Sequence, residues 1–451
     1  MALALQEQMM EDAHECIVVG LGKTGLSVAR HLHRRGISFA MTDTRDQPPG
    51  LAAFRREFPH LDICTGALPA QWFAAANQIV LSPGVDTRNP AIQAAIARGA
   101  ECLGDVELFA SANRVPVVAV TGSNGKSTVV QLVTEMASAC GLCAYAGGNI
   151  GTPVLDLLEK DDAQLFVLEL SSFQLESTWS LKPRIGAVLN VSADHLDRHD
   201  SLEQYAEIKA RIYAHASCSV VNRDDGFVMK MKTSGMVTDF GLGRPADRGF
   251  GLLQRGMHSY LAQGDHCLLS TDSLKMQGEA GILNALAALA IGHAFGLSME
   301  NMCSVLKRFK GLPHRLSQVG ESRGVAWFND SKGTNVGASV MSLRSLESNV
   351  ILLAGGIFKG GDLAGLRSAV ARHAKHAILF GQDSDLLRQA LRGAVQIHSA
   401  DTMRDAVVQA QALSVAGDKV LLSPACASFD MYENYIARGR DFESCVRELV
   451  L

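Results

Sequence analysis

Short apolar runs alternate with amphipathic stretches along the chain. Near its start, the run Cys16–Val19 precedes a Gly-rich segment and a helical pattern at Leu26–Arg34, and further apolar runs follow at Ile37–Met41 and Ile79–Leu81. This succession predicts βαβ units, which build a parallel, doubly wound sheet. Ligands bind such sheets at the carboxyl ends of the strands, so the loops that follow these runs are candidate sites.

The same rhythm begins again near Arg114. Val115–Val120 is followed by a Gly-rich loop and a helical pattern from Ser127 to Ala139, and two further runs end in polar residues, Leu165–Leu168 and Ile185–Leu189. A third series follows the turn-forming residues 310–313, with runs at Val325–Phe328, Val350–Leu353, Ala377–Phe380 and Val420–Leu422.

These patterns predict an α/β protein of three domains. They are an N-terminal Rossmann-like domain (residues 1–107), a central P-loop-type ATPase domain with a parallel sheet (108–311), and a C-terminal Rossmann-like domain (312–451). The length of 451 residues allows this number, and a hydrophobic content of 47% allows a core in each.

Composition and charge argue against several classes of protein. The formal charge is −4 and no basic run stands out, so we expect no nucleic-acid partner. The acidic N-terminal segment does not resemble a signal peptide, and no apolar run approaches the ~20 residues that span a bilayer, so we expect no membrane insertion. Ten scattered cysteines suit a reducing cytoplasm, and Cys140 and Cys143 are expected to be ordinary thiols.

The sharpest motif is VVAVTGSNGKST at residues 117–128, where a strand delivers a Gly-rich turn to a helix N-terminus. Backbone N–H groups there suit a phosphate, Lys126 can neutralise its charge, and the Ser127 hydroxyl can ligate Mg²⁺. The match to a Walker A loop is not strict, because Val120 stands where that pattern has its first glycine. The alternative is a structural Gly-rich turn with a surface lysine.

Polar residues crowd the ends of the next two strands. Glu169 directly follows one of them and could complete a Mg²⁺ site begun by Ser127. The segment NVSADHLDRH at residues 190–199 offers His195 as the best ligand candidate, although a polar loop with helix caps would look similar. Lys209, in YAEIKARIY, reads from charge alone as part of a solvated helix face.

Taken together, TGSNGKST, LELSSFQLE, NVSADHLDRH, YAEIKARIY, PHR and NDSKGTN resemble the Mur ligase family, in the same order and over nearly the whole chain. The versions GLGKTGLS and SPACASFD are most similar to the members that act on D-glutamate. The resemblance implies an ATP-dependent acid–amino-acid ligase of peptidoglycan precursor synthesis. Its substrates would be UDP-N-acetylmuramoyl-L-alanine (UDP-MurNAc-L-Ala), D-glutamate and ATP, with two Mg²⁺ ions as cofactors, and the enzyme would be a monomer working through an acyl phosphate.

The resemblance also implies a role for each matching position. The residues that would act in catalysis are Lys126, His195 and Lys209. Those that would bind ATP are Gly122, Ser123, Asn124, Gly125, Lys126, Ser127, Thr128, Asn284, Arg315 and Asp330. The UDP substrate would contact Thr24, Asp43, Thr44, Arg45, Ser82, Pro83, Gly84 and Asn149. D-Glutamate would be positioned by Lys332, Thr334, Lys359, Ser428 and Phe429. The metal ligands would be Ser127, Glu169, His195 and Lys209, the last as its carbamate.

Other functions stay open at this stage. The pattern Gly20-x-Gly22-x-x-Gly25, with Asp43 further on, would by itself predict an NAD-dependent oxidoreductase, whereas the resemblance assigns the same loop to UDP. Another Mur ligase, a folylpolyglutamate synthetase, or a nucleotide-binding switch without ligase activity are further alternatives. The chain departs from the family pattern at Ala280 and Gly281 and at Phe358.

Overall fold

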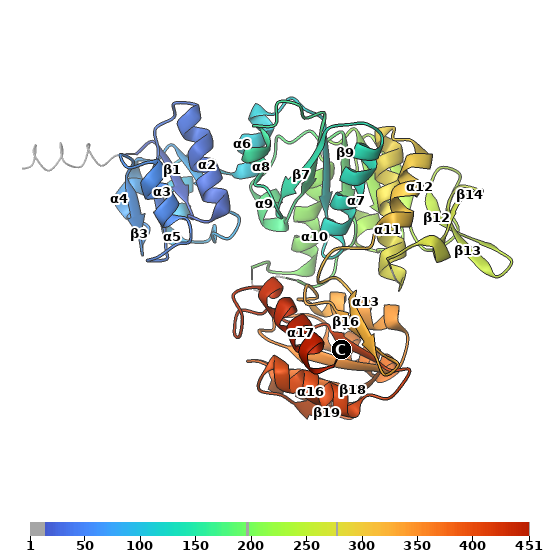
Figure 1. The fold of residues 1–451 in the computed structure, drawn as a ribbon. Coiled ribbons are helices and arrows are strands. Elements are labelled where there is room, and N and C mark those ends of the chain that lie inside the picture. Colours follow the sequence, from blue (N-terminus) through green and yellow to red (C-terminus); the bar gives the residue numbers. More distant parts are fainter. Residues whose placement is uncertain (1–13, 195–197, 277, 451) are drawn as a thin grey trace, which may run out of the picture.

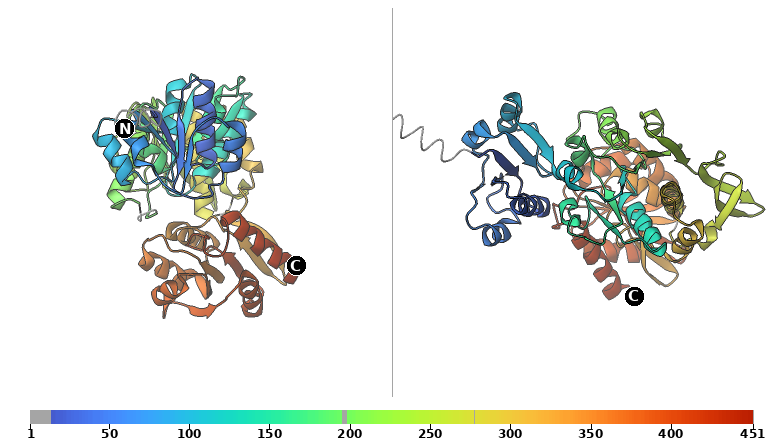
Figure 2. Two further views of the ribbon diagram at one scale, coloured as in Figure 1. Left: turned by 90° about the vertical axis from the view of Figure 1, so that its left-hand side faces the viewer. Right: turned by 90° about the horizontal axis from the view of Figure 1, so that it is seen from above.

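The structure is a computed structural model that describes residues 14–194, 198–276 and 278–450. Three sheets lie in three lobes, coloured blue, green to yellow, and orange to red along the chain (Figure 1). In Figure 1 and in the left view of Figure 2 the C-terminal lobe lies below the other two. This arrangement confirms the expected three-domain α/β class, while the limits at residues 107 and 312 stay predictions.

The first sheet has five strands in the order β3-β2-β1-β4-β5, all parallel. Strand β2 lies later in the chain than the apolar run at Ile37–Met41 suggests. Its last residues, Thr42 and Asp43, are buried, and their side chains form hydrogen bonds with the backbone of Ala67 and Leu21. The elements are β1 (Cys16–Val19), α2 (Lys23–Arg34), β2 (Ala40–Asp43), α3 (Leu51–Glu57), β3 (Ile63–Thr65), α4 (Ala70–Ala75), β4 (Gln78–Leu81), α5 (Pro90–Ala97) and β5 (Glu101–Gly104).

The second sheet has nine strands in the order β14-β13-β12-β11-β10-β9-β6-β8-β7. Its last pairs, β12 with β13 and β13 with β14, are antiparallel, and the sequence pattern did not predict these hairpins. The elements are α6 (Asp105–Ala112), β6 (Val117–Thr121), α7 (Lys126–Ala139), β7 (Ala144–Gly148), α8 (Val154–Leu157), β8 (Leu165–Glu169), α9 (Ser172–Glu176), β9 (Ile185–Val188), α10 (Leu202–Ala210), β10 (Cys218–Asn222), β11 (Met236–Phe240), β12 (Phe250–Arg255), β13 (His258–Gln263), β14 (His266–Ser270), α11 (Gly278–Phe295) and α12 (Met299–Arg308).

The core of this second lobe joins α7 and α11 to the sheet, with Val129, Val133 and Leu289 among its fully buried side chains. Within the described residues, α11 is the one helix whose length and hydropathy would allow it to cross a bilayer. Half of it is buried inside the protein, which is the behaviour of a core helix.

The third sheet has six strands in the order β15-β16-β20-β17-β18-β19, with β15 antiparallel to its neighbour and the rest parallel. Because β16, β20 and β17 are central, the loops that follow them meet at one edge of the sheet. The elements are β15 (Ser317–Ser322), β16 (Val325–Asn329), α13 (Val336–Leu346), β17 (Val350–Gly355), α14 (Leu363–His373), β18 (Ala374–Phe380), α15 (Ser384–Leu391), β19 (Gln396–Ser399), α16 (Met403–Leu413), β20 (Lys419–Leu422) and α17 (Tyr435–Leu449).

Asp105, at the junction of the first two lobes, yields a prediction about stability. Its side chain is 2% exposed, and its Oδ1 has no hydrogen-bond partner in the described structure. Burial raises the pKa of Asp105 from 3.8 to about 6. As pH rises from 4 through 6 the unfolded state loses this proton first, so ionisation of Asp105 lowers the free energy of unfolding. We expect Asp105→Asn to stabilise the protein by roughly 2–3 kcal/mol above pH 7 and progressively less toward pH 4.

Urea unfolding of the wild type and of Asp105→Asn at several pH values measures this difference. The exposed Asp161→Asn is the matched control, for which we expect no pH-dependent gain. A lower stability of Asp105→Asn at pH 8 would show that the carboxylate is favourably paired.

Candidate active site

The phosphate loop joins β6 to α7, and two glycines give it its shape. Gly122 and Gly125 have φ values of +149° and +86°, a region that disfavours side chains. A Cβ atom on Gly125 would also lie 2.4 Å from Oδ1 of Asn284, so the loop packs directly on α11. The N-terminal N–H groups of α7 are thereby presented at the carboxyl edge of the sheet, where they can bind an anion.

Lys126 is the first residue of α7, and its side chain folds back over the loop. Its Nζ donates to the carbonyl oxygens of Gly122 at 2.7 Å and Ser123 at 3.0 Å. Burial lowers the pKa of Lys126, while the carboxylates of Glu169 and Asp194 act in the opposite direction. The ammonium therefore lies where a bound phosphate would meet it.

Ser127, Glu169 and Arg315 form a close polar cluster beside the phosphate loop. The Ser127 hydroxyl donates to Oε2 of Glu169 at 2.6 Å and accepts from Nη2 of Arg315 at 2.6 Å. The other oxygen of this 2% exposed carboxylate accepts from Nδ2 of Asn149 at 2.8 Å. Arg315 comes from the third lobe, so this cluster joins the two lobes at the phosphate loop.

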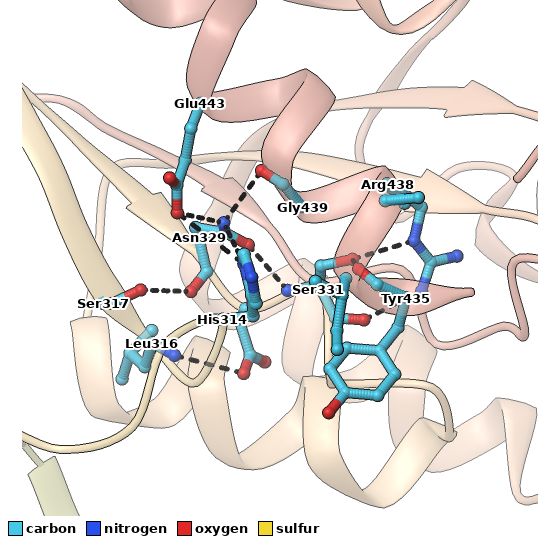
Figure 3. A network of polar contacts seen from close by, with 12 residues as sticks. His314, Leu316, Ser317, Asn329, Ser331, Tyr435, Arg438, Gly439 and Glu443 are labelled. Carbon is cyan, nitrogen blue, oxygen red and sulfur yellow. Dashed lines mark hydrogen bonds and ion pairs between the residues drawn. The ribbon is translucent and has the colours of Figure 1, made fainter. Parts of the chain in front are cut away.

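The position of Arg315 is set by the neighbouring His314, whose backbone is left-handed with φ +61°. Nδ2 of Asn329, at the end of β16, donates to Nδ1 of His314 at 2.8 Å and to Oε1 of Glu443 at 2.8 Å (Figure 3). These bonds fix the PHR segment to the third sheet. Arg315 is thereby held against the central lobe.

Lys209, on α10, is buried with 1% exposure, which differs from the solvated helix face expected from its charged neighbours. Its Nζ donates to the carbonyl oxygen of Gly122 at 3.1 Å and lies 4.3 Å from the centre of the Tyr205 ring. Burial, followed by the Lys126 ammonium, lowers the pKa of Lys209 well below its usual value. An amine that is easily deprotonated can react with CO₂ to give a carbamate.

The loop after β9 also reaches the third lobe. Asp194 is 7% exposed, and its oxygens accept from Nζ of Lys359 at 2.8 Å and from Nδ2 of Asn335 at 3.0 Å. Sequence reasoning did not assign a role to Asp194 or Asn335, although both lie in segments it singled out. His195 lies outside the described residues.

Three loops of the third lobe are joined by backbone hydrogen bonds. The carbonyl of Gly333 accepts from the N–H of Ala425, and Ile357 pairs with Ala427 in an antiparallel bridge. Three segments thus lie side by side: one carries Lys332 and Thr334, the second carries Lys359, and the third carries Ser428 and Phe429. Ser428 is buried, whereas the ring of Phe429 is 72% exposed.

Asp330 was expected at the ATP ribose, and the structure gives it several partners within the chain. Its Oδ2 accepts from the hydroxyls of Ser342 and Ser423, each at 2.7 Å, and its Oδ1 accepts from the N–H of Leu316 at 3.2 Å. Burial raises the pKa of Asp330 to about 6. The carboxyl group connects α13 and β20 to the PHR segment.

The N-terminal candidates form a separate group at the edge of the first sheet. Oδ2 of Asp43 accepts from the N–H of Leu21 at 2.7 Å and from Nη2 of Arg45 at 2.7 Å, and Oγ of Ser82 donates to the Gly20 carbonyl at 2.9 Å. Thr24 lies in the first turn of α2, while Thr44, Pro83 and Gly84 belong to the loops that follow β2 and β4. Asn149, predicted to touch the muramoyl part of the same substrate, lies in the second lobe beside Glu169.

The residues at the phosphate loop could supply part of the ligand shell of a magnesium ion. Mg²⁺ takes oxygen ligands from one or two protein groups and fills its shell with phosphate and water, which the Ser127 hydroxyl and the Glu169 carboxylate can satisfy. Among the described residues, no group of three or more His, Cys, Asp or Glu side chains could form an all-protein metal site.

Comparison with known proteins agrees with this geometry. Models of the Mur ligase MurD-like N-terminal domain, the Mur ligase middle domain and the Mur ligase glutamate ligase domain match residues 14–104, 120–292 and 314–426. The chain belongs to the Mur ligase family, which confirms the resemblance found in its motifs.

Two relatives are similar over almost their full length. The chain is 47% identical over 435 residues to the UDP-N-acetylmuramoylalanine--D-glutamate ligase of Pseudomonas savastanoi pv. phaseolicola, covering 95% of this chain and 97% of that protein. It is 46% identical over 437 residues to the ligase of the same name from Nitrosococcus oceani, covering 96% of each.

A solved structure supports the fold. UDP-N-acetylmuramate-alanine ligase MurC from Thermotoga maritima matches with a TM-score of 0.60 at 17% identity, covering 96% of this chain and 99% of that one.

Proposed function

We propose that this protein catalyses the ATP-dependent addition of D-glutamate to UDP-MurNAc-L-Ala in peptidoglycan precursor synthesis, giving ADP and phosphate. The observation that carries the proposal is the junction of Lys126, Ser127 and Glu169 with Arg315 from the third lobe. Such a junction can hold a triphosphate between two lobes. The chain is 46–47% identical, over nearly its full length, to ligases named for this reaction, which favours this reaction over those of other family members.

In this proposal ATP lies along the phosphate loop, residues 122–128, with Asn284 packed beneath Gly125 and with Arg315 and Asp330 on the opposite lobe. The alanyl carboxylate attacks the γ-phosphorus of ATP, and the bond to the β–γ bridging oxygen breaks, leaving ADP and an acyl phosphate. The Lys126 ammonium and the Arg315 guanidinium offset the charge that accumulates where two anions meet.

Two Mg²⁺ ions, when bound, would neutralise phosphate charge and orient the triphosphate. Ser127 and Glu169 would hold the first ion. His195 and Lys209, the latter as a carbamate, would hold the second. Lys209 is suited to this role because burial disfavours its charged form and a carbamate would replace the cation by an anion.

The second half-reaction takes place beside the third lobe. The amine of D-glutamate, once deprotonated, attacks the acyl carbon, and phosphate leaves. We propose that Lys332, Thr334, Lys359, Ser428 and Phe429 position the amino acid, because the loops that carry them lie side by side. For UDP we propose Thr24, Asp43, Thr44, Arg45, Ser82, Pro83 and Gly84 at the edge of the first sheet, with Asn149 at the muramoyl end.

We also propose that the enzyme works as a cytoplasmic monomer that does not insert into membranes. All ten cysteines are free in the structure, which suits a reducing compartment. Light scattering coupled to gel filtration tests the monomer, and a dimeric mass would contradict it.

Phosphate release is the direct test of the reaction. With UDP-MurNAc-L-Ala and ATP present, we expect rapid release on addition of D-glutamate and release at least about 10²-fold slower with L-glutamate, meso-diaminopimelate or L-lysine, since a site built for one polar substrate leaves groups unpaired with another. Turnover with only a different amino acid, or with a folate substrate, would assign the chain to another ligase. Hydride transfer from NADH would support the oxidoreductase alternative.

A further inference from the structure

Lys332 and Tyr435 form a cation–π pair. The Nζ atom of Lys332 lies 4.1 Å from the centre of the Tyr435 ring. Lys332 follows β16, whereas Tyr435 is the first residue of α17, more than a hundred positions later in the chain. A cation over the face of an aromatic ring is attracted by the negative potential of that face, and more strongly when both are shielded from water.

The backbone that carries the ring is fixed by hydrogen bonds at the start of α17. The side-chain Oδ1 of Asn434 caps α17, accepting from the N–H groups of Ile436 and Ala437 at 2.9 Å each. The carbonyl oxygen of Tyr435 accepts from the hydroxyl of Ser331 at 2.8 Å, directly before Lys332 (Figure 3). The backbone segments that carry the two partners are therefore fixed side by side.

Arg438, one turn further along α17, also attaches this helix to Ser331. Its side chain is 1% exposed, and its guanidinium donates to Oγ of Ser331 at 3.0 Å and to the carbonyl of Ser331 at 2.8 Å (Figure 3). It also donates to the carbonyl of Cys426 at 3.2 Å. The start of α17 is thus joined to two of the loops proposed to hold D-glutamate.

The surroundings of Lys332 otherwise oppose its charge. Burial lowers the pKa of Lys332 to about 8, and Arg315, Lys126 and Lys359 act in the same direction, while Glu169 alone among these neighbours favours the ammonium form. The aromatic ring is a neutral partner that favours the charged form and brings no negative charge that would repel a phosphate.

We propose that Tyr435 is a positioning residue: its ring fixes the Lys332 ammonium, so that Lys332, besides positioning D-glutamate, offsets the charge of the transferring phosphoryl group. This inference rests on the proposed ligase function. It assigns to α17 a part in the phosphoryl-transfer half of the reaction. A purely structural role, such as packing against His314 at a ring distance of 6.3 Å, is the competing explanation.

A double-mutant cycle separates the two explanations. The variants are Tyr435→Leu, Tyr435→Phe, Lys332→Ala and Tyr435→Leu/Lys332→Ala, and the readout is single-turnover ADP formation together with KM for ATP. We expect Tyr435→Leu to lower the rate of ADP formation by about 3- to 30-fold, with KM changed less than about twofold, because a cation–π contact has this strength. Tyr435→Phe should stay within about twofold of wild type, because the ring face is retained.

The cycle supports the proposal if Tyr435→Leu causes no further loss once Lys332 is alanine. An equal loss in both backgrounds would overturn it, and so would a Phe variant as slow as the Leu variant. The ring contact is also measured without activity, by NMR of the protein carrying ¹³C-dimethylated lysines, with the Lys332 signal assigned through Lys332→Arg.

An upfield ring-current shift of the Lys332 methyl signals that is present in wild type and in Tyr435→Phe, and absent in Tyr435→Leu, establishes the contact. An unshifted signal in wild type refutes it whatever the activity. A wild type that releases no phosphate with D-glutamate counts against the proposed function, not against the pairing.

Discussion

Lys126→Ala will lower kcat/KM for the ligation by at least about 10³-fold, because the variant loses the cation closest to the helix terminus that receives the phosphates. In the structure the Lys126 Nζ is held by two carbonyl oxygens of the loop, so it is already placed where charge would develop. The fold should survive, since Ser127, Thr128 and the two loop glycines stay in place. The measurement is phosphate release at saturating D-glutamate.

The matched control for this variant is Lys307→Ala, which removes an exposed lysine from α12 in the same lobe. We expect it to leave the rate within about twofold of wild type, as for most exposed positions. A Lys126→Ala enzyme within tenfold of wild type would show that Arg315 or bound metal carries the neutralisation alone.

Lys209→Ala has the second largest expected effect, a loss of about 10²–10³-fold in kcat. The neutral amine of Lys209 can add to CO₂, forming an N–C bond and releasing a proton, and the resulting carboxylate would face the phosphate loop. Truncation to alanine leaves a space beside Gly122 that a small carboxylic acid can enter. We therefore expect acetate or formate to restore part of the rate to Lys209→Ala.

Lys209→Arg is the matched control for the rescue, because arginine keeps the positive charge, fills the space and forms no stable carbamate. It should be slow and should not respond to acetate. Recovery with methylamine instead of acetate would mean that Lys209 acts as a cation, and undiminished turnover of Lys209→Ala would exclude a carbamate role.

Several of the parallel strands were predictable from sequence because buried strands form continuous apolar runs, as in Leu165–Leu168 and Val350–Leu353. The hairpins formed by β12, β13 and β14 were not, since a strand such as His258–Gln263 mixes polar and apolar residues and has exposed positions. β11 likewise begins with the exposed Met236 and Val237. These strands lie toward the β14 end of the sheet and have exposed positions, so their side chains carry a weak hydrophobic pattern.

The residues of the candidate site were likewise predictable only in part. The phosphate loop and Glu169 follow local rules, because a strand, a glycine turn and a helix N-terminus are adjacent in sequence. The pairs Asp194–Lys359 and Ser331–Arg438 join positions more than a hundred residues apart, and no local pattern encodes them. The burial of Lys209 was also hidden, because its neighbours Glu207 and Arg211 make the segment look solvated.

The Asp194–Lys359 ion pair has a consequence for how tightly the amino acid can be held. If Lys359 receives a carboxylate of D-glutamate, that ammonium must exchange one anionic partner for another. Binding of D-glutamate then replaces the Lys359–Asp194 ion pair by an ion pair between Lys359 and the substrate carboxylate. The free energy of binding from this contact is only the difference between two similar attractions. Such an exchange favours modest affinity and prompt release, while Asp194 keeps its hydrogen bond from Asn335.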